Sequence, residues 1–142
     1  MTRSDTALRL GLENTASQEQ ISNMQALAVN VLQRVRDHFD MPVKINSGLR
    51  TLLVNRAVGS KDHSDHVNGM AADIETSVPN AELAQWIVDN CDFRQVILEF
   101  YTPGIPDSGW VHVSYNPGDN KKQVLTAARQ GGKTVYLPGL VA

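Results

Sequence analysis

The sequence predicts an α+β fold in which helices pack on an antiparallel sheet. Apolar residues recur at steps of three and four over residues 21–39 and 80–91, which is the period of an amphipathic helix. After residue 95, apolar and polar residues alternate in short segments, which is typical of strands. Because the helical patterns come mainly first and the strand patterns mainly last, this class is favoured over alternating βαβ units.

Length and composition indicate one globular domain spanning residues 1–142. The formal net charge is −2, and neither sign forms a long block, so we expect neither nucleic acid nor an anionic membrane surface as a partner. Cys91 is the sole cysteine, which excludes an intrachain disulfide and a cysteine-based zinc cluster. Any metal site must therefore use histidine and carboxylate ligands.

The first predicted helix covers residues 21–39. Ser17 and Gln20 have the spacing of a capping box before it, and Pro42 follows its end. A short strand is expected over residues 43–46, and one or two helical turns over residues 52–58.

The second predicted helix covers residues 80–91, with Asn80 as its N-cap. Strands are expected over residues 95–101 and 110–115, separated by a loop at residues 102–109. Residues 123–128 and 133–137 flank two glycines and are expected to form a terminal hairpin.

Residues 64–74, SDHVNGMAADI, contain the first candidate metal ligands. A helix would also place His66 and Asp73 on one face, but Asn68-Gly69 is a poor helix interior and a strong hairpin signal. If Asn68-Gly69 is a two-residue turn, His66 and Asp73 become diagonal neighbours on one face, with Ser64 directly across from Asp73. The hairpin interpretation therefore predicts that one imidazole and one carboxylate converge.

A third ligand can come from the strand WVHVSY, in which His112 points to the face opposite Val111 and Val113. Two histidines and one carboxylate, with a fourth position open to water, form a common catalytic zinc set. Zinc held in this way polarises carbonyl groups and activates water, so hydrolysis is the expected chemistry.

Three segments, SGLRTLLVNRAVG, SDHVNGMAADI and WVHVSY, closely resemble motifs of the zinc D-alanyl-D-alanine carboxypeptidase and L-alanyl-D-glutamate endopeptidase family. This family includes phage endolysins and shares a superfamily with the hedgehog signalling domain. Segments near both ends, SDTALRLGLENTAS and QVLTAARQGGKTVYLPGL, are also similar to members of the family. The resemblance implies a hedgehog and D-Ala-D-Ala peptidase-like fold, with Zn²⁺ bound by His66, Asp73 and His112. It also implies that Arg50 and Ser64 hold the substrate or the developing oxyanion.

The general base is a choice between two carboxylates. Several branches of the family have an acidic residue three positions before the last zinc histidine, where this sequence has Gly109. Glu99, in ILEF, resembles instead the glutamate of the branch that has Trp before the Val-His pair. We expect Glu99 to be the base, with Asp107 as the alternative, and a base must reach the attacking water.

The sequence therefore predicts a zinc peptidase that hydrolyses either the L-Ala–D-Glu or the D-Ala–D-Ala bond of the peptidoglycan stem peptide. The alternative is a non-catalytic zinc-containing binding domain of the same fold. The sequence has no signal-peptide pattern and no apolar segment of membrane-spanning length. We therefore expect a monomer, made in the cytoplasm and without a membrane partner, that acts on the cell wall as a phage or prophage lysin or as a virion component.

Overall fold

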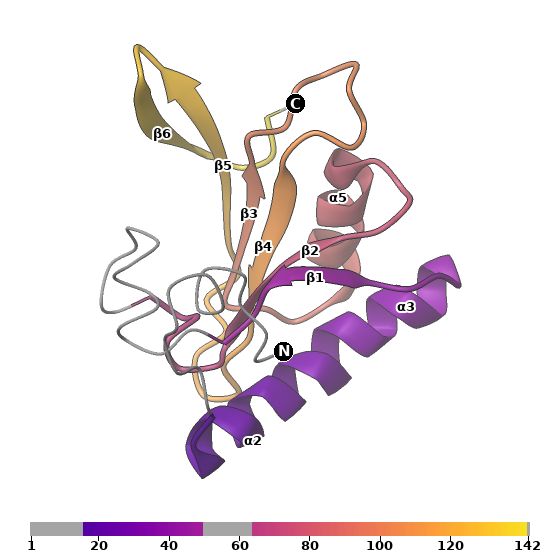
Figure 1. Cartoon of the computed structure of the whole chain (residues 1–142), viewed down its shortest axis with the longest axis vertical. Coiled ribbons are helices and arrows are strands. Elements are labelled where there is room, and N and C mark those ends of the chain that lie inside the picture. The colour runs from indigo at the N-terminus through magenta and orange to yellow at the C-terminus, as the bar shows by residue number, and fades with distance from the viewer. Residues whose placement is uncertain (1–15, 50–63, 142) are drawn as a thin grey trace, which may run out of the picture.

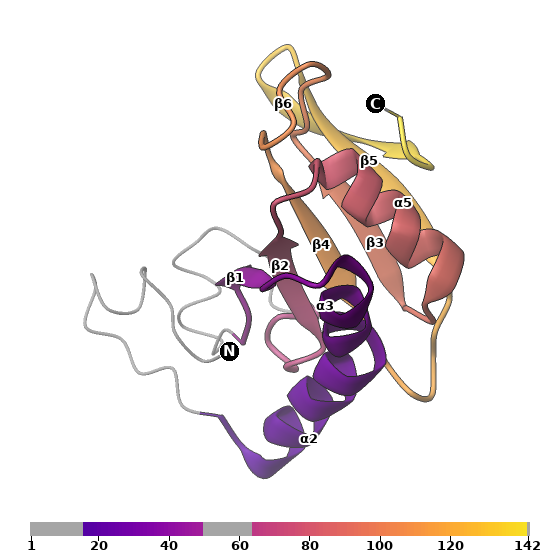
Figure 2. The same ribbon diagram turned by 90° about the vertical axis from the view of Figure 1, so that its right-hand side faces the viewer.

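The computed structural model describes residues 16–49 and 64–141, in which a six-stranded sheet carries helices on one face (Figures 1 and 2). The strand order is β1-β2-β4-β3-β5-β6. The α+β class is confirmed. None of the helices in these two ranges has the length and apolar character that a membrane crossing requires.

The sheet is mixed, which corrects the expectation of an antiparallel one. Strand β3 (Gln95–Glu99) pairs antiparallel with β4 (Trp110–Ser114) but parallel with β5 (Gln123–Gln130). The end of β4 lies beside the start of β3, with Ser114 opposite Gln95. The connection to β5 enters the sheet at that same end, next to Gln95, so β5 has to run in the direction of β3.

The first predicted helix forms with the expected cap. It consists of α2 (Gln18–Leu27), a π-helical turn η1 (Ala28–Leu32) and α3 (Gln33–Phe39). Ser17 and Gln20 form the capping box, in which each side chain accepts from the other residue's backbone N–H. The helix ends where Asp40 takes a left-handed conformation, with φ of 52°.

Helix α5 (Asn80–Asn90) also lies where the sequence predicts a helix, but its predicted cap is wrong. Pro79 occupies the N-cap position, and Asn80 is the first helical residue. The Asn80 side-chain amide donates instead to the carbonyls of Ser108 and Gly109, at 2.9 and 3.2 Å. Asn80 thus ties the predicted 102–109 loop, which connects β3 to β4, to the start of α5.

The hydrophobic core lies between the helices and the sheet. In Figure 2, α3 and α5 lie in front of the same face of the sheet. The core takes alternate residues from the strands and the apolar stripes of the helices, as the two periodicities require. Its fully buried members include Leu27, Val31, Val35, Ile74, Leu83, Ile87, Val96, Leu98, Val111 and Val113.

The hairpin predicted around Asn68-Gly69 is wrong. Residues 65–69 form a compact turn, and the strand that follows, β2 (Ala71–Glu75), pairs with β1 (Lys44–Ser47) on one edge and with β4 on the other. Both edges of β2 are therefore occupied, so residues 64–67 cannot pair with it as the other strand of a hairpin.

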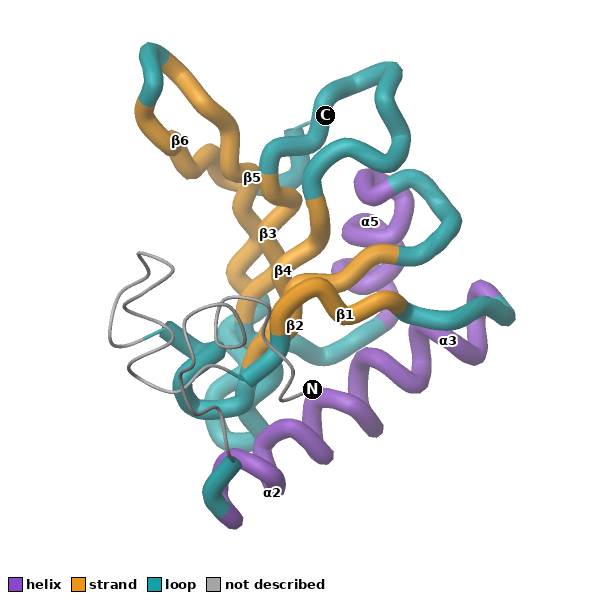
Figure 3. Tube along the Cα trace, in the orientation of Figure 1, coloured by secondary structure: helices purple, strands orange, loops and turns teal. Residues whose placement is uncertain are grey.

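The C-terminal hairpin is confirmed as β5 and β6 (Lys133–Pro138), the pair at the upper left of Figure 3. Gly131 and Gly132 have φ of +58° and +78°, which a tight two-residue turn of this kind requires. The strand expected at residues 43–46 is confirmed as β1, one residue later. The helical turns expected at residues 52–58 lie outside the described residues.

Candidate metal centre

Asp73 and His112 lie on the face of the sheet opposite to the helices. Their neighbours in the chain, Ala72, Ile74, Val111 and Val113, face the core. Residues directly opposite in a ladder point to the same face, and Asp73 of β2 is the register partner of His112 of β4. The two side chains therefore emerge next to each other.

His66 reaches the same point from the turn that precedes β2. Its Nε2 lies 3.2 Å from Asp73 Oδ1, and His112 Nδ1 lies 3.1 Å from that same oxygen. The two imidazole rings are 5.1 Å apart, and one potential ligand atom from each of the three residues lies within 4.8 Å of the others. The structure thus brings together the three residues predicted to be ligands, and this group could bind a metal ion.

The hydrogen bonding of His66 fits a metal ligand. Its Nδ1 lies 2.7 Å from the Gly48 carbonyl oxygen, which can only accept, so Nδ1 carries a hydrogen. In the neutral ring Nε2 then has a lone pair that points toward Asp73. Histidines that bind metals are commonly oriented by such a bond from the second ring nitrogen. Two imidazoles and a carboxylate also match the donor preferences of zinc.

Electrostatics couples the three side chains. Burial, the largest single influence on Asp73, raises the pKa of its carboxyl, but hydrogen bonds and charge from His112 and His66 outweigh it, and the pKa lies well below its ordinary value. For His112, burial lowers the pKa, while the hydrogen bond and charge of Asp73, together with the charges of Glu99 and Asp65, raise it above its ordinary value. The site therefore favours a cation between the imidazoles and Asp73.

Glu99 projects from β3 on the face of the metal cluster. Its register partner is Trp110, and Ile97, two residues before it, is the partner of His112. Since partners and alternate residues share a face, Glu99 and His112 lie diagonally across neighbouring strands. Glu99 is half-buried, and its charge acts on His112. The expected placement of Glu99 thus agrees with the structure, while its role as base stays a prediction.

Asp107, the alternative base, is exposed in the 102–109 loop. The carbonyl of Pro106 accepts a hydrogen bond from the Asn80 backbone N–H, and the carbonyl of Ser108 accepts one from the Asn80 side-chain amide. Asn80 begins α5, which packs on the other face of the sheet. Asp107 thus lies in a loop that is tied to the helical layer, and the choice between Glu99 and Asp107 as the base stays a prediction.

Arg50 and Ser64 are the two residues expected to hold substrate, and the structure describes Ser64. Arg50 lies outside the described residues. Ser64 opens the turn that carries His66, and its Oγ accepts a hydrogen bond from the His66 backbone N–H at 3.3 Å. Ser64 is thus next to a candidate ligand in space as well as in sequence.

Gly109, where several branches have an acidic residue, has no room for a side chain. Its φ is +65°, and a Cβ would overlap the Glu99 carbonyl oxygen and lie 2.8 Å from the Phe100 carbonyl carbon. An acidic residue at this position would require the backbone to move. The close approach of this segment to the backbone of Glu99 and Phe100 leaves no space for a side chain at position 109.

The Gly48 carbonyl is a site group that the sequence does not predict. A backbone oxygen has no residue-type signature, and the turn signal at Ser47-Gly48 indicates only that the chain bends there.

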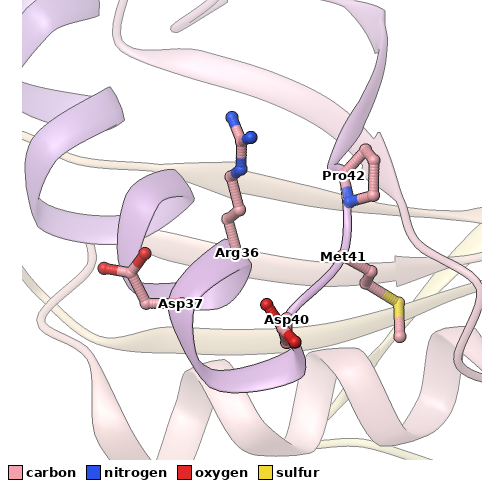
Figure 4. Close-up of a pocket in the computed structure, with 5 residues that line it drawn as sticks. All are labelled: Arg36, Asp37, Asp40, Met41 and Pro42. Atoms are coloured by element: carbon pink, nitrogen blue, oxygen red, sulfur yellow. The ribbon is translucent and has the colours of Figure 1, made fainter.

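A separate pocket, drawn in Figure 4, lies at the end of α3 and is lined by Arg36, Asp37, Asp40, Met41 and Pro42. Its charged side chains point apart and do not form a cluster of metal ligands.

Comparison with known families finds a family whose model covers most of the chain. Residues 1–114 match the family described as Peptidase M15. The matched range contains His66, Asp73, Glu99 and His112 and ends with the last residue of β4. A search of curated proteins found no match.

Proposed function

Since this chain belongs to the peptidase M15 family, we propose that it is a zinc-dependent peptidase that hydrolyses a bond in the stem peptide of peptidoglycan. The bond is either the one between L-Ala and D-Glu or the one between two D-Ala residues. The observation that carries the proposal is the convergence of His66, Asp73 and His112 within 4.8 Å of one another, on the sheet face away from the helices.

Three side chains would hold the zinc ion: His66 through Nε2, Asp73 through a carboxylate oxygen and His112 through Nδ1. Catalytic zinc sites commonly have three protein ligands of these types and keep one position open. When bound there, zinc supplies a Lewis acid that polarises a carbonyl and makes water more acidic. The Gly48 carbonyl holds the His66 ring in the required tautomer.

Glu99 would be the general base. It lies on the cluster's face of the sheet, diagonal to His112, and its charge acts on that imidazole. A carboxylate in this position can accept a proton from the attacking water and later deliver it to the leaving amine nitrogen. Proton transfer by a positioned group typically contributes 10² to 10⁴-fold in rate.

Arg50 and Ser64 would position the substrate. A guanidinium suits a peptide carbonyl, a terminal carboxylate or a developing oxyanion, because it offers several donors and keeps its charge. Ser64 already accepts a hydrogen bond from the His66 N–H, and its own hydroxyl hydrogen can be donated to substrate. In this proposal the protein acts on the cell wall as a monomer, in the manner of a phage or prophage lysin or a virion component.

The test is digestion of purified peptidoglycan by the zinc-loaded protein, followed by mass spectrometry of the soluble fragments. We expect a new amino terminus on D-Glu or free D-Ala, and the same spectrum identifies the bond. Glu99→Gln should lower the rate by at least ~10²-fold while zinc content stays unchanged. Glu82→Gln, on the exposed side of α5, is the matched control and should retain full activity.

Two outcomes would contradict this function. If the wild-type protein binds zinc but releases no fragment, the alternative of a non-catalytic zinc-containing binding domain is favoured. If Glu99→Gln cleaves at the wild-type rate, the base lies elsewhere, and Asp107→Asn is the next variant to measure.

A further inference from the structure

The turn that carries His66 lies outside the strand ladders. Residues 64–70 close on themselves through hydrogen bonds from Val67 N to Ser64 O, from Gly69 N to His66 O and from Met70 N to Asp65 O. A short turn of this kind lacks the long ladders that hold Asp73 and His112 in place. The position of His66 therefore depends on what the turn contacts.

Helix α2 holds one side of the turn. Gln20 Nε2 donates to the Val67 carbonyl at 2.7 Å, and Asn23 Nδ2 donates to the Asn68 carbonyl at 2.9 Å. The backbones also meet closely, because a Cβ on Gly69 would lie 2.7 Å from the Gln20 carbonyl oxygen. Three consecutive residues that follow His66 are thus fixed to the first turns of α2.

A second contact holds the other side of the turn. Arg94, just before β3, forms an ion pair with Asp65, with Nε 3.3 Å from Asp65 Oδ2, and donates from Nη1 to Asp119 Oδ2 at 3.1 Å. The carboxylate of Asp65 is largely buried. The residues on both sides of His66 are therefore tied to different parts of the fold.

Both polar atoms of the Gln20 side-chain amide form hydrogen bonds. Its Oε1 accepts from the Ser17 N–H at 2.8 Å, as one half of the capping box, while its Nε2 donates to Val67. With one end bound to a donor and the other to an acceptor, the orientation of the amide is determined. A single side chain thus joins the start of α2 to the turn that carries a candidate metal ligand.

We propose that Gln20 is a positioning residue for His66, which sets the affinity of the cluster for zinc by holding the turn at residues 64–70 against α2. This inference rests on the proposed zinc function. Groups that orient metal ligands typically affect metal affinity 10- to 100-fold when they are removed. Gln20 acts one step further out, through the backbone of the turn, so we expect the lower end of that range.

Two substitutions of Gln20 separate this role from helix capping. Gln20→Glu keeps the oxygen that accepts from Ser17 but replaces the donor to Val67 by a second oxygen, which the carbonyl repels. Gln20→Met removes the donor without adding a charge that could itself attract a cation, and it also removes the Oε1 that accepts from Ser17 N–H. Ser17→Ala is the matched control, because it weakens the cap and leaves the bond from Gln20 to Val67 in place.

Zinc affinity is measured by chelator competition on the full chain, together with the visible spectrum of the cobalt-substituted protein and thermal unfolding of the metal-free protein. We expect Gln20→Glu and Gln20→Met to weaken zinc binding about tenfold and to alter the cobalt spectrum. Ser17→Ala should lower the melting temperature of the metal-free protein but leave zinc affinity and the cobalt spectrum unchanged.

The inference is overturned if both Gln20 variants bind zinc as tightly as the wild type with an identical cobalt spectrum, or if Ser17→Ala weakens zinc binding equally. A wild-type protein that binds no zinc would overturn the proposed function itself, and this inference with it. Normal zinc affinity in the Gln20 variants together with normal peptidase activity would reject the role of Gln20 alone.

Discussion

Asp73 and His112 face each other across β2 and β4, with Asp73 Oδ1 3.1 Å from His112 Nδ1. A direct register pair is the closest arrangement that two neighbouring strands allow. The pair is set into the middle of the sheet, since β1 and β3 lie on its two sides. Two of the three proposed ligands therefore lie on inner strands of the sheet, and the third, His66, comes from a turn.

Removal of one proposed ligand should abolish metal binding. His66→Ala leaves one imidazole and one carboxylate, which is fewer than the three protein ligands of a catalytic zinc site. We expect the zinc content of the purified variant, measured by elemental analysis, to fall to background. His38→Ala is the matched control, since His38 is exposed and stacks on Trp86 in the helical layer. Full zinc retention by His66→Ala would show that the ligand assignment is wrong.

The metal-free protein should be most stable in a window of acidic pH. The pKa of Asp73 lies below its ordinary value, so its contribution is present above the unfolded value of about 3.9 and lost as pH falls through the folded one. The pKa of His112 lies above its ordinary value, so its contribution is present below about 6.5 and lost as pH rises through the folded one. The melting temperature of chelator-treated protein should therefore peak between about pH 4 and 6.5.

Zinc should remove the decline on the alkaline side of this window. Metal ions bind neutral imidazole and compete with protons, so zinc affinity increases with pH, and a ligand that binds only the folded state stabilises it. The difference in melting temperature between zinc-loaded and chelator-treated protein should widen from pH 6 to pH 8. A difference that stays constant over that range would contradict the proton-coupled binding expected for His112.

A side chain at position 109 should destabilise the fold more than one at another glycine with the same backbone conformation. Gly109 and Gly104 both have positive φ, but only at Gly109 would a Cβ meet neighbouring atoms. We expect Gly104→Ala to lower the free energy of unfolding by about 1–2 kcal/mol from backbone strain. Gly109→Ala should lower it by a further ~1–3 kcal/mol, because the backbone of Glu99 and Phe100 must move.

Denaturant unfolding of the two glycine variants measures this difference. Gly109→Ala should also reduce peptidase activity, because the residue whose backbone is displaced is the proposed base. Equal stability of the two variants would mean that the backbone at Gly109 moves away from Glu99 and Phe100 at little cost in free energy. Gly109→Asp should then be tolerated, and the absence of an acidic residue there would have no structural cause.

Elements with local signals can be predicted from the amino-acid sequence. The capping box of Ser17 and Gln20, the apolar stripes of the two helical segments and the Gly131-Gly132 hairpin all depend on residues close together in the chain. The type of site can also be predicted, because two imidazoles and a carboxylate in these motifs are typical zinc ligands. His66, Asp73 and His112 are therefore predicted as ligands from the sequence, and the structure shows that they form a group that could bind a metal ion.

How those residues come together depends on contacts between distant parts of the chain. Asn68-Gly69 signals a hairpin, but β1 and β4 occupy both edges of β2, so the turn has to dock on α2 instead. The parallel pairing of β3 with β5 likewise follows from where β4 ends. Which strand pairs with each edge depends on residues far apart in sequence, so a local sequence pattern cannot predict it.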